Sequence, residues 1–190
     1  MPSLLSQLKQ HSVVVADTGN LVAINRFQPE DATTNPSIIL KALQAGQYQR
    51  QVDDALRQAI RSGAAPRAII AEACDRLVVS MGVEILATIR GKVSTEVPAA
   101  LSFDSAATVA RARALHQRYL QLGIPGDRVL VKIAATWEGI QAARQLEREG
   151  IRCNLTLIFN LAQARACAEA GIYLVSPFVG RILDWHRQQT

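Results

Sequence analysis

The stretch Val129-Leu130-Val131-Lys132-Ile133-Ala134-Ala135 decides the fold and suggests the chemistry of this chain. Its apolar and β-branched residues predict a strand buried on both faces, as in a parallel sheet. A lysine there is unusual, because burial disfavours the ammonium form and lowers the pKa of the amine. A neutral amine can attack a carbonyl, so the first hypothesis is a Schiff-base lysine. The alternative is a structural lysine that reaches water at the strand end or pairs with a buried carboxylate.

Short strand patterns alternate with helical patterns on both sides of this stretch. The predicted strands cover residues 13–17, 32–35, 93–97, 129–134, 153–159 and 174–179. Residues 36–90 carry only helical periodicity and predict two or three helices, with a break at residues 62–66. Glycine followed by isoleucine at Gly123, Gly150 and Gly171 marks three helix ends. The alternation predicts an α/β fold with parallel strands and crossover helices.

Composition fits a cytoplasmic enzyme of one domain. The 190 residues are 49% hydrophobic, and the net charge of +5 is spread along the chain without long basic runs. This favours anionic small substrates at least as well as nucleic acid, which we do not expect as a partner. Three cysteines without a CxxC pair fit a reducing compartment. We expect neither export nor membrane insertion, since no basic leader and no run of eighteen apolar residues is present.

Polar side chains gather where the predicted strands end. These residues are Asp17, Asn35, Glu96, Lys132, Asn154, Thr156 and Ser176. Ligands of parallel α/β folds bind at the carboxyl ends of the strands, so we expect one site there. A lysine with two carboxylates suits aldol cleavage through an imine, and the amides and hydroxyls suit sugar hydroxyls. Arg181, after Gly180 at the start of the last helix, is either a phosphate ligand or a surface arginine.

At these positions the sequence resembles transaldolase, the Schiff-base enzyme family of the pentose phosphate pathway. The likeness runs from residue 4 to residue 187, and four motifs carry it. They are Asp31-Ala32-Thr33-Thr34-Asn35-Pro36-Ser37, the stretch from Val129 to Ile140 around Lys132, Cys153-Asn154-Leu155-Thr156-Leu157-Ile158-Phe159, and Ser176-Pro177-Phe178-Val179-Gly180-Arg181.

The resemblance implies a role for each of these residues. Lys132 would be the imine nucleophile, Asp17 the acid/base on the substrate hydroxyl, and Glu96 with Thr156 would orient a water. Asn35, Asn154 and Ser176 would hold a dihydroxyacetone unit, Phe178 would wall the pocket, and Arg181 would contact phosphate. The implied reaction converts sedoheptulose 7-phosphate and glyceraldehyde 3-phosphate into erythrose 4-phosphate and fructose 6-phosphate. The resemblance implies no metal and no organic cofactor.

Two departures from the family pattern qualify these expectations. Where the family usually reads Glu-Val-Asp-Ala-Arg-Leu-Ser, this chain reads Glu96-Val97-Pro98-Ala99-Ala100-Leu101-Ser102, and Pro98 can end the strand and re-aim Glu96. The second departure is length, because an eight-stranded barrel of the TIM type takes about 250 residues. We therefore expect one domain over residues 1–190 that forms an incomplete parallel (β/α) barrel of about six strands, with open edges that favour self-association.

Other functions remain open at this point. A truncated, non-catalytic chain that completes its barrel by association would fit Pro98, Ala100 and the early stop. An aldolase that cleaves or condenses without transfer would share the lysine, although it usually lacks a carboxylate placed like Glu96. Nucleic-acid binding rests on the overall charge alone.

Overall fold

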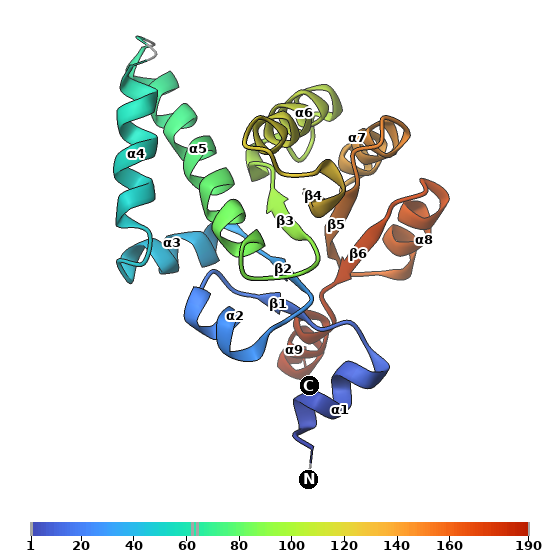
Figure 1. Ribbon diagram of the computed structural model, residues 1–190. Helices are drawn as coiled ribbons and strands as arrows, with labels where there is room; N and C mark the ends of the chain where they lie inside the picture. Colours follow the sequence, from blue (N-terminus) through green and yellow to red (C-terminus); the bar gives the residue numbers. More distant parts are fainter. Residues whose placement is uncertain (1, 62, 64, 190) are drawn as a thin grey trace. The chain divides into compact units, whose positions relative to one another are not determined.

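The computed structural model describes residues 2–61, 63 and 65–189, and the chain divides into two compact units (Figure 1). The first unit comprises Met1–Thr95 and Leu122–Arg128, and the second comprises Glu96–Gln121 and Val129–Thr190. Both units are built from parallel strands and helices, so the predicted α/β class is confirmed.

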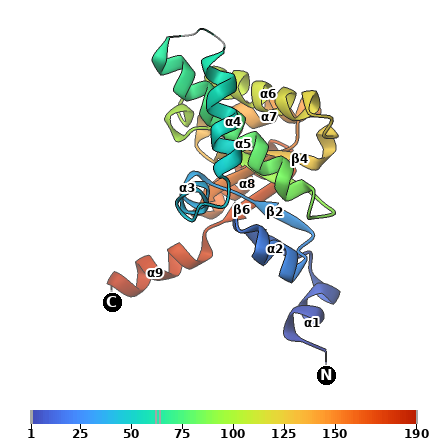
Figure 2. The same cartoon turned by 60° about the vertical axis from the view of Figure 1, so that its left-hand side comes forward.

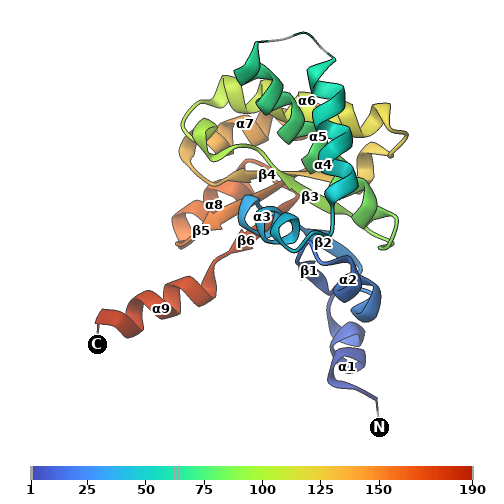
Figure 3. The ribbon, with the colours of Figure 1, turned by 90° about the vertical axis from the view of Figure 1, so that its left-hand side faces the viewer.

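The first unit has three short parallel strands with helices between them. Its elements are α1 (Leu4–His11), β1 (Val15–Asp17), α2 (Leu21–Phe27), β2 (Asp31–Thr33), α3 (Pro36–Gln44), α4 (Gln49–Ile60), α5 (Pro66–Leu86), β3 (Val93–Glu96, whose last residue belongs to the second unit) and the 3-10 helix η2 (Gly126–Arg128). β2 pairs with β1 on one side and β3 on the other. Helices α4 and α5 lie side by side (Figures 1 and 3).

Tyr48 centres a small core in the first unit. Its side chain is fully buried with Ala42 and Met81, and its hydroxyl donates to Gly19 O at 2.8 Å. Burial, and then the negative charge of Glu84, raises the pKa of Tyr48 to about 12. The phenol is therefore neutral at physiological pH and keeps its role as a donor.

The second unit holds two long and deeply buried strands, β4 and β5, and a shorter, partly exposed one, β6. Its elements are the 3-10 helix η1 (Ala99–Leu101), α6 (Ser105–Gln121), β4 (Val129–Ala134), α7 (Trp137–Arg148), β5 (Cys153–Ile158), α8 (Leu161–Glu169), β6 (Leu174–Pro177) and α9 (Val179–Gln189). Strand β5 pairs in parallel with β4 and β6. Every residue of β4 is buried, as the apolar run predicts. Helix α9 extends away from β6 and α8 (Figures 2 and 3), and its described residues include no buried one.

The predicted elements agree with the structure apart from their ends. All six strands form, but residues 13–14, 34–35, 97, 159 and 178–179 lie outside them. Residues 36–90 fold into three helices, and Pro66 begins α5, although residues 62 and 64 of the predicted break lie outside the described part. A TIM-type barrel has eight parallel strands that alternate with helices, and the described residues form six such strands. The prediction of an incomplete parallel (β/α) barrel is therefore confirmed.

Helix ends in the second unit follow the glycine signal in the sequence. Gly150 and Gly171 have φ values of 82° and 73°. These values lie in the left-handed region, which glycine adopts without steric cost. Each following isoleucine folds back, with Ile151 N donating to Leu146 O and Ile172 N to Cys167 O. In the part of the chain that the structure describes, no helix combines the length and apolar character needed to cross a membrane.

Candidate active site

Lys132 lies in the middle of β4 with its side chain only 7% exposed. Its Nζ is 3.6 Å from Oε2 of Glu96, whose side chain is 17% exposed. Backbone pairing places the two residues together, because Val97 N donates to Lys132 O at 3.0 Å. The strand of Lys132 thus buries the lysine side chain, and the last residue of β3 supplies a carboxylate beside it. Of the two structural alternatives for Lys132, pairing with a carboxylate is observed.

Pro98 does not displace Glu96 from the lysine. Strand β3 ends at Glu96, and Pro98 lies immediately before η1, one residue beyond the Val97 bond to Lys132. Because proline lacks only its own N–H, the ladder bond that fixes Glu96 is kept. Pro98 therefore lies in the loop after the carboxylate, and Glu96 stays beside Lys132. Ala100 lies exposed in that loop.

Three further predicted residues lie on neighbouring strands of the same unit. In register, Lys132 is opposite Asn154 and Ala134 is opposite Thr156, so Lys132, Asn154 and Thr156 share one face by strand alternation. Ser176 on β6 donates its hydroxyl to Oδ1 of Asn154 at 2.8 Å. The Thr156 hydroxyl is buried and has no hydrogen-bond partner within the described residues. The second unit thus brings together an amine, a carboxylate, an amide and two hydroxyls.

The start of α7 packs closely against the end of β4. Thr136 caps this helix by accepting from Gly139 N at 3.0 Å, and the Thr136 hydroxyl donates to Ser102 O. A Cβ atom at Gly139 would overlap the carbonyl oxygen of Ala134. Only glycine allows this approach, so Gly139 sets the distance between α7 and the strand that carries Lys132. Gly139 is not among the predicted site residues, although a glycine in a first helical turn is a usable signal.

Phe178 and Arg181 follow β6. Phe178 N donates to Ile158 O at 2.9 Å, and its ring meets Phe159 edge to face with centroids 5.5 Å apart. Arg181 is exposed in the first turn of α9, as the sequence predicts. An exposed position is compatible both with a phosphate ligand and with a surface arginine.

Asp17 and Asn35 belong to the first unit. Asp17 is the exposed last residue of β1, opposite Thr33 of β2. Asn35 is the N-cap of α3, and its Oδ1 accepts from Ile38 N at 2.9 Å. The oxygen of this amide therefore serves the helix, and its nitrogen is the group that can donate to a ligand.

Cys153, directly before Asn154, is not a competing nucleophile. Burial, and then the charge of Glu147, raises the pKa of its thiol far above the usual range. Cys74, Cys153 and Cys167 are all free.

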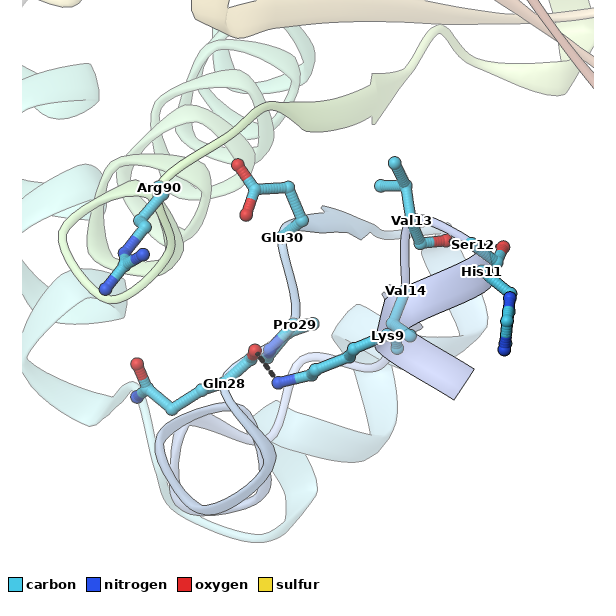
Figure 4. Close-up of a pocket in the computed structure, with 9 residues that line it drawn as sticks. All are labelled: Lys9, His11, Ser12, Val13, Val14, Gln28, Pro29, Glu30 and Arg90. Carbon is cyan, nitrogen blue, oxygen red and sulfur yellow. Dashed lines mark hydrogen bonds between the residues drawn. The ribbon is translucent and has the colours of Figure 1, made fainter. Parts of the chain in front are cut away.

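A cavity of about 640 Å³ lies in the first unit apart from these residues. Residues 9, 11–14, 28–30 and 90 line it, which places it before β1 and β2 and therefore at the amino ends of those strands. Figure 4 shows the Lys9 amine turned to the backbone of Gln28, where it donates to O at 2.5 Å, and Lys9 donates also to Phe27 O. No predicted site residue lines this cavity.

Parallel strands joined by helices, with a buried lysine beside a carboxylate, define an α/β protein of the barrel class. The chain belongs to the transaldolase/fructose-6-phosphate aldolase family, whose model matches residues 14–190.

Relatives named transaldolase cover nearly the whole chain. One from Thermosynechococcus vestitus is 59% identical over 191 residues, covering 99% of this chain and 49% of the relative. One from Chromohalobacter salexigens is 59% identical over 98% of this chain and 59% of the relative, and one from Shewanella sp. ANA-3 is 54% identical over 100% and 60%. The chain thus spans about half to three fifths of the length of these relatives.

Proposed function

We propose that this chain acts as a transaldolase and transfers a dihydroxyacetone unit from sedoheptulose 7-phosphate to glyceraldehyde 3-phosphate. The observation that carries the proposal is the buried Lys132 amine 3.6 Å from the Glu96 carboxylate, in a chain of this family. Both chemistry and relatives support it, because an amine out of water and beside a proton acceptor is suited to forming an imine.

The first half of the reaction forms the imine. The Lys132 nitrogen attacks the ketone carbon C2, and the resulting carbinolamine loses water to give a protonated imine. Glu96 carries the protons between the amine, the departing oxygen and a water that the Thr156 hydroxyl helps to orient. The buried position of Thr156 opposite Ala134 supports this role, since that places its hydroxyl on the face of Lys132.

The second half breaks and remakes a carbon–carbon bond. Asp17 takes the proton from the C4 hydroxyl, the C3–C4 bond breaks, and its electron pair moves toward the imine to leave an enamine. Erythrose 4-phosphate departs. The enamine then attacks the aldehyde of glyceraldehyde 3-phosphate, Asp17 returns the proton to the new hydroxyl, and water releases fructose 6-phosphate and free Lys132.

The remaining residues bind substrate in this proposal. Asn35, Asn154 and Ser176 contact the hydroxyls and carbonyl of the dihydroxyacetone unit, and Phe178 walls the pocket. Arg181 contacts a phosphate. The Ser176 bond to Asn154 supports the pairing of these two side chains around one ligand group. None of these steps calls for a metal or an organic cofactor.

Borohydride reduction in the presence of fructose 6-phosphate tests the proposal. Reduction fixes the imine as a stable adduct, which peptide mass analysis locates. We expect the adduct on Lys132, none in Lys132→Met, and an unchanged amount in the control Lys41→Met, whose lysine is exposed on α3. A folded chain that forms no adduct, or forms it on another lysine, contradicts the proposal.

The fate of the bound three-carbon unit separates transferase from aldolase. We expect transfer of this unit to added erythrose 4-phosphate, measured as a fall in the concentration of that acceptor. An adduct without transfer would instead favour an aldolase that only cleaves. A non-catalytic chain that completes its barrel by association would give neither result.

We further infer that the chain works in the cytoplasm and associates with a second copy. The three free cysteines support a reducing compartment. Among the described residues β6 pairs only with β5, and apolar side chains lie exposed immediately before it, on it and after it. These are Tyr173 (45%), Val175 (36%), Val179 (72%), Leu183 (49%) and Trp185 (58%).

Such an unpaired strand edge beside an apolar surface favours pairing between chains. Sedimentation equilibrium should show a dimer or larger species that the double variant Leu183→Ser and Trp185→Ser weakens. A monomer at high concentration would contradict the inference.

A further inference from the structure

Leu157 has a backbone conformation that leucine rarely adopts. Its φ of 60° lies in the left-handed region, directly after Thr156 in β5. The pairing with β6 explains the turn, since Leu155 is opposite Val175 and Ile158 is opposite Pro177. β5 therefore has one residue more than β6 over this interval, which is a β-bulge. The bulge turns the backbone immediately beyond the Thr156 side chain.

The carboxamide of Gln163 makes three hydrogen bonds at this bulge. Its oxygen accepts from Phe159 N at 2.9 Å, and its nitrogen donates to Leu157 O at 3.2 Å and to Ala135 O at 2.8 Å. Gln163 is the third residue of α8, and its own N–H is taken up by the Asn160 cap. The bond to Phe159 N, one residue before the Asn160 cap, resembles the reciprocal bond of a capping box. The two donated bonds reach the ends of β5 and β4 and need another explanation.

The bonded groups lie next to the proposed imine chemistry. Ala135 comes three residues after Lys132, and its N–H donates to Thr156 O at 2.8 Å. Its carbonyl is the group that Gln163 binds. One side chain thus fixes the end of the lysine strand against the strand position of Thr156. Thr156 itself is buried, with its hydroxyl unpartnered in the described part of the chain.

We propose that Gln163 is a positioning residue that holds the Leu157 bulge and thereby directs the Thr156 hydroxyl toward the face of Lys132 on which the imine forms and is hydrolysed. The proposal rests on the proposed function. Gln163 itself does not touch substrate or the reacting atoms, so its loss changes the rate of the proton and water steps and leaves substrate affinity alone.

The first test measures how fast the Lys132 adduct accumulates with fructose 6-phosphate at fixed borohydride. We expect Gln163→Ala to lower the limiting rate at least tenfold, with an unchanged half-saturating sugar concentration. Gln163→Glu keeps an acceptor for Phe159 N but sets an oxygen against two carbonyls, so it should also be slow. The matched control is Gln145→Ala, which removes an exposed helical glutamine bonded to Glu149. A normal rate in Gln163→Ala overturns the proposal.

A second substitution tests whether Leu157 is the link. Glycine adopts a φ of 60° without steric penalty, so a glycine at this position needs less support from Gln163. We expect Leu157→Gly to restore at least a third of the lost rate when combined with Gln163→Ala. Complete failure of this rescue in a folded double variant overturns the role of the bulge.

Amide hydrogen exchange tests the positioning without any activity. Gln163→Ala should speed exchange of the Ala135 and Phe178 amides, which bond to Thr156 O and Ile158 O on either side of the bulge. The Val131 amide, bonded to Arg152 O at the other end of β4, serves as the internal reference. Unchanged exchange at both Ala135 and Phe178, relative to Val131, overturns the proposal. If the unaltered chain forms no adduct, the proposed function fails, and exchange still decides whether Gln163 holds the bulge.

Discussion

Strands β4 and β6 belong to the same unit, yet other elements cover β4 and leave β6 partly exposed. All six residues of β4 are buried, whereas β6 alternates between half-buried and exposed positions. Helix α7 after β4 buries five residues, and α9 after β6 buries none of those described. Both segments are rich in apolar residues, so the difference lies in their neighbours. Apolar sequence becomes core only where another element covers it.

The residues of the proposed reaction differ in the same way in their burial. Lys132, Glu96 and Thr156 sit in the covered part of the unit, where removal from water strengthens electrostatic contacts. Ser176, Phe178 and Arg181 sit on or after β6, where side chains are half-buried or exposed. We therefore expect imine formation to be more robust than phosphate binding and transfer.

The largest difference in the free energy of unfolding is expected between truncating an apolar side chain in a covered strand and truncating one in β6. Leu155 on β5 is fully buried, so Leu155→Ala should lower the free energy of unfolding by about 3 kcal/mol through lost contacts and a cavity. Val175 on β6 is 36% exposed, and Val175→Ala should cost less than about 1 kcal/mol. Urea unfolding followed by circular dichroism measures both. Equal losses would mean that β6 is covered in solution, as self-association would cause.

Alanine substitution of two glycines gives a smaller expected difference in the free energy of unfolding. In Gly139→Ala the new methyl group overlaps Ala134 O, so α7 must shift and the free energy of unfolding should fall by about 2 kcal/mol. Gly180 in the first turn of α9 has no atom within 4 Å of the position of a Cβ, and Gly180→Ala should stabilise by no more than about 1 kcal/mol. The same unfolding assay applies. A neutral Gly139→Ala would contradict the close packing of α7 on β4.

Surface ion pairs give the smallest expected effect. Arg113 of α6 binds Glu149 after α7 through two hydrogen bonds of 2.8 and 2.6 Å, whereas Arg165 and Glu169 pair within α8. Hydrogen bonds from Arg113, and then from Gln145, lower the pKa of Glu149. A lowered folded pKa contributes stability above the unfolded value of about 4.3, and that stability is lost as pH falls through the folded value.

Arg113→Gln should therefore lower the urea midpoint slightly at pH 7, with the difference vanishing at low pH. Arg165→Gln, which breaks only a pair within one helix, should leave the midpoint unchanged. Unfolding curves at pH 7 and below pH 4 check both. A midpoint shift for Arg113→Gln that persists in acid would show that the arginine acts through packing.

Much of the local structure could be predicted from the residues alone. The Val129–Ala134 strand has the predicted bounds, because a continuous β-branched run has few other stable environments. The caps at Thr136 and Asn160 were also predictable, since a side-chain oxygen next to an orphan N–H acts locally. Asn35 was placed on a strand by its motif, and the structure makes it the N-cap of α3.

Three residues were missed in the roles that the structure gives them. Leucine is not a left-handed residue by preference, so the conformation of Leu157 follows from a mismatch in length between β5 and β6. Gln163 lies three positions after the cap residue Asn160, which is a local capping signal, yet its bond to Ala135 spans 28 positions of sequence. Gly139 is required by a carbonyl on another element. Each role depends on a contact with another secondary-structure element.

The sequence by itself determined the parallel α/β pattern, the buried lysine and the family, because periodicity and motifs are properties of adjacent residues. Only the tertiary structure decided that Glu96 stands 3.6 Å from Lys132 despite Pro98, that Gln163 joins the ends of β4 and β5, and that β4 is covered while β6 and α9 are not. The physical reason is that strand pairing and burial are set between segments far apart in the chain. A side chain acquires its partners and its exclusion from water only when those segments meet.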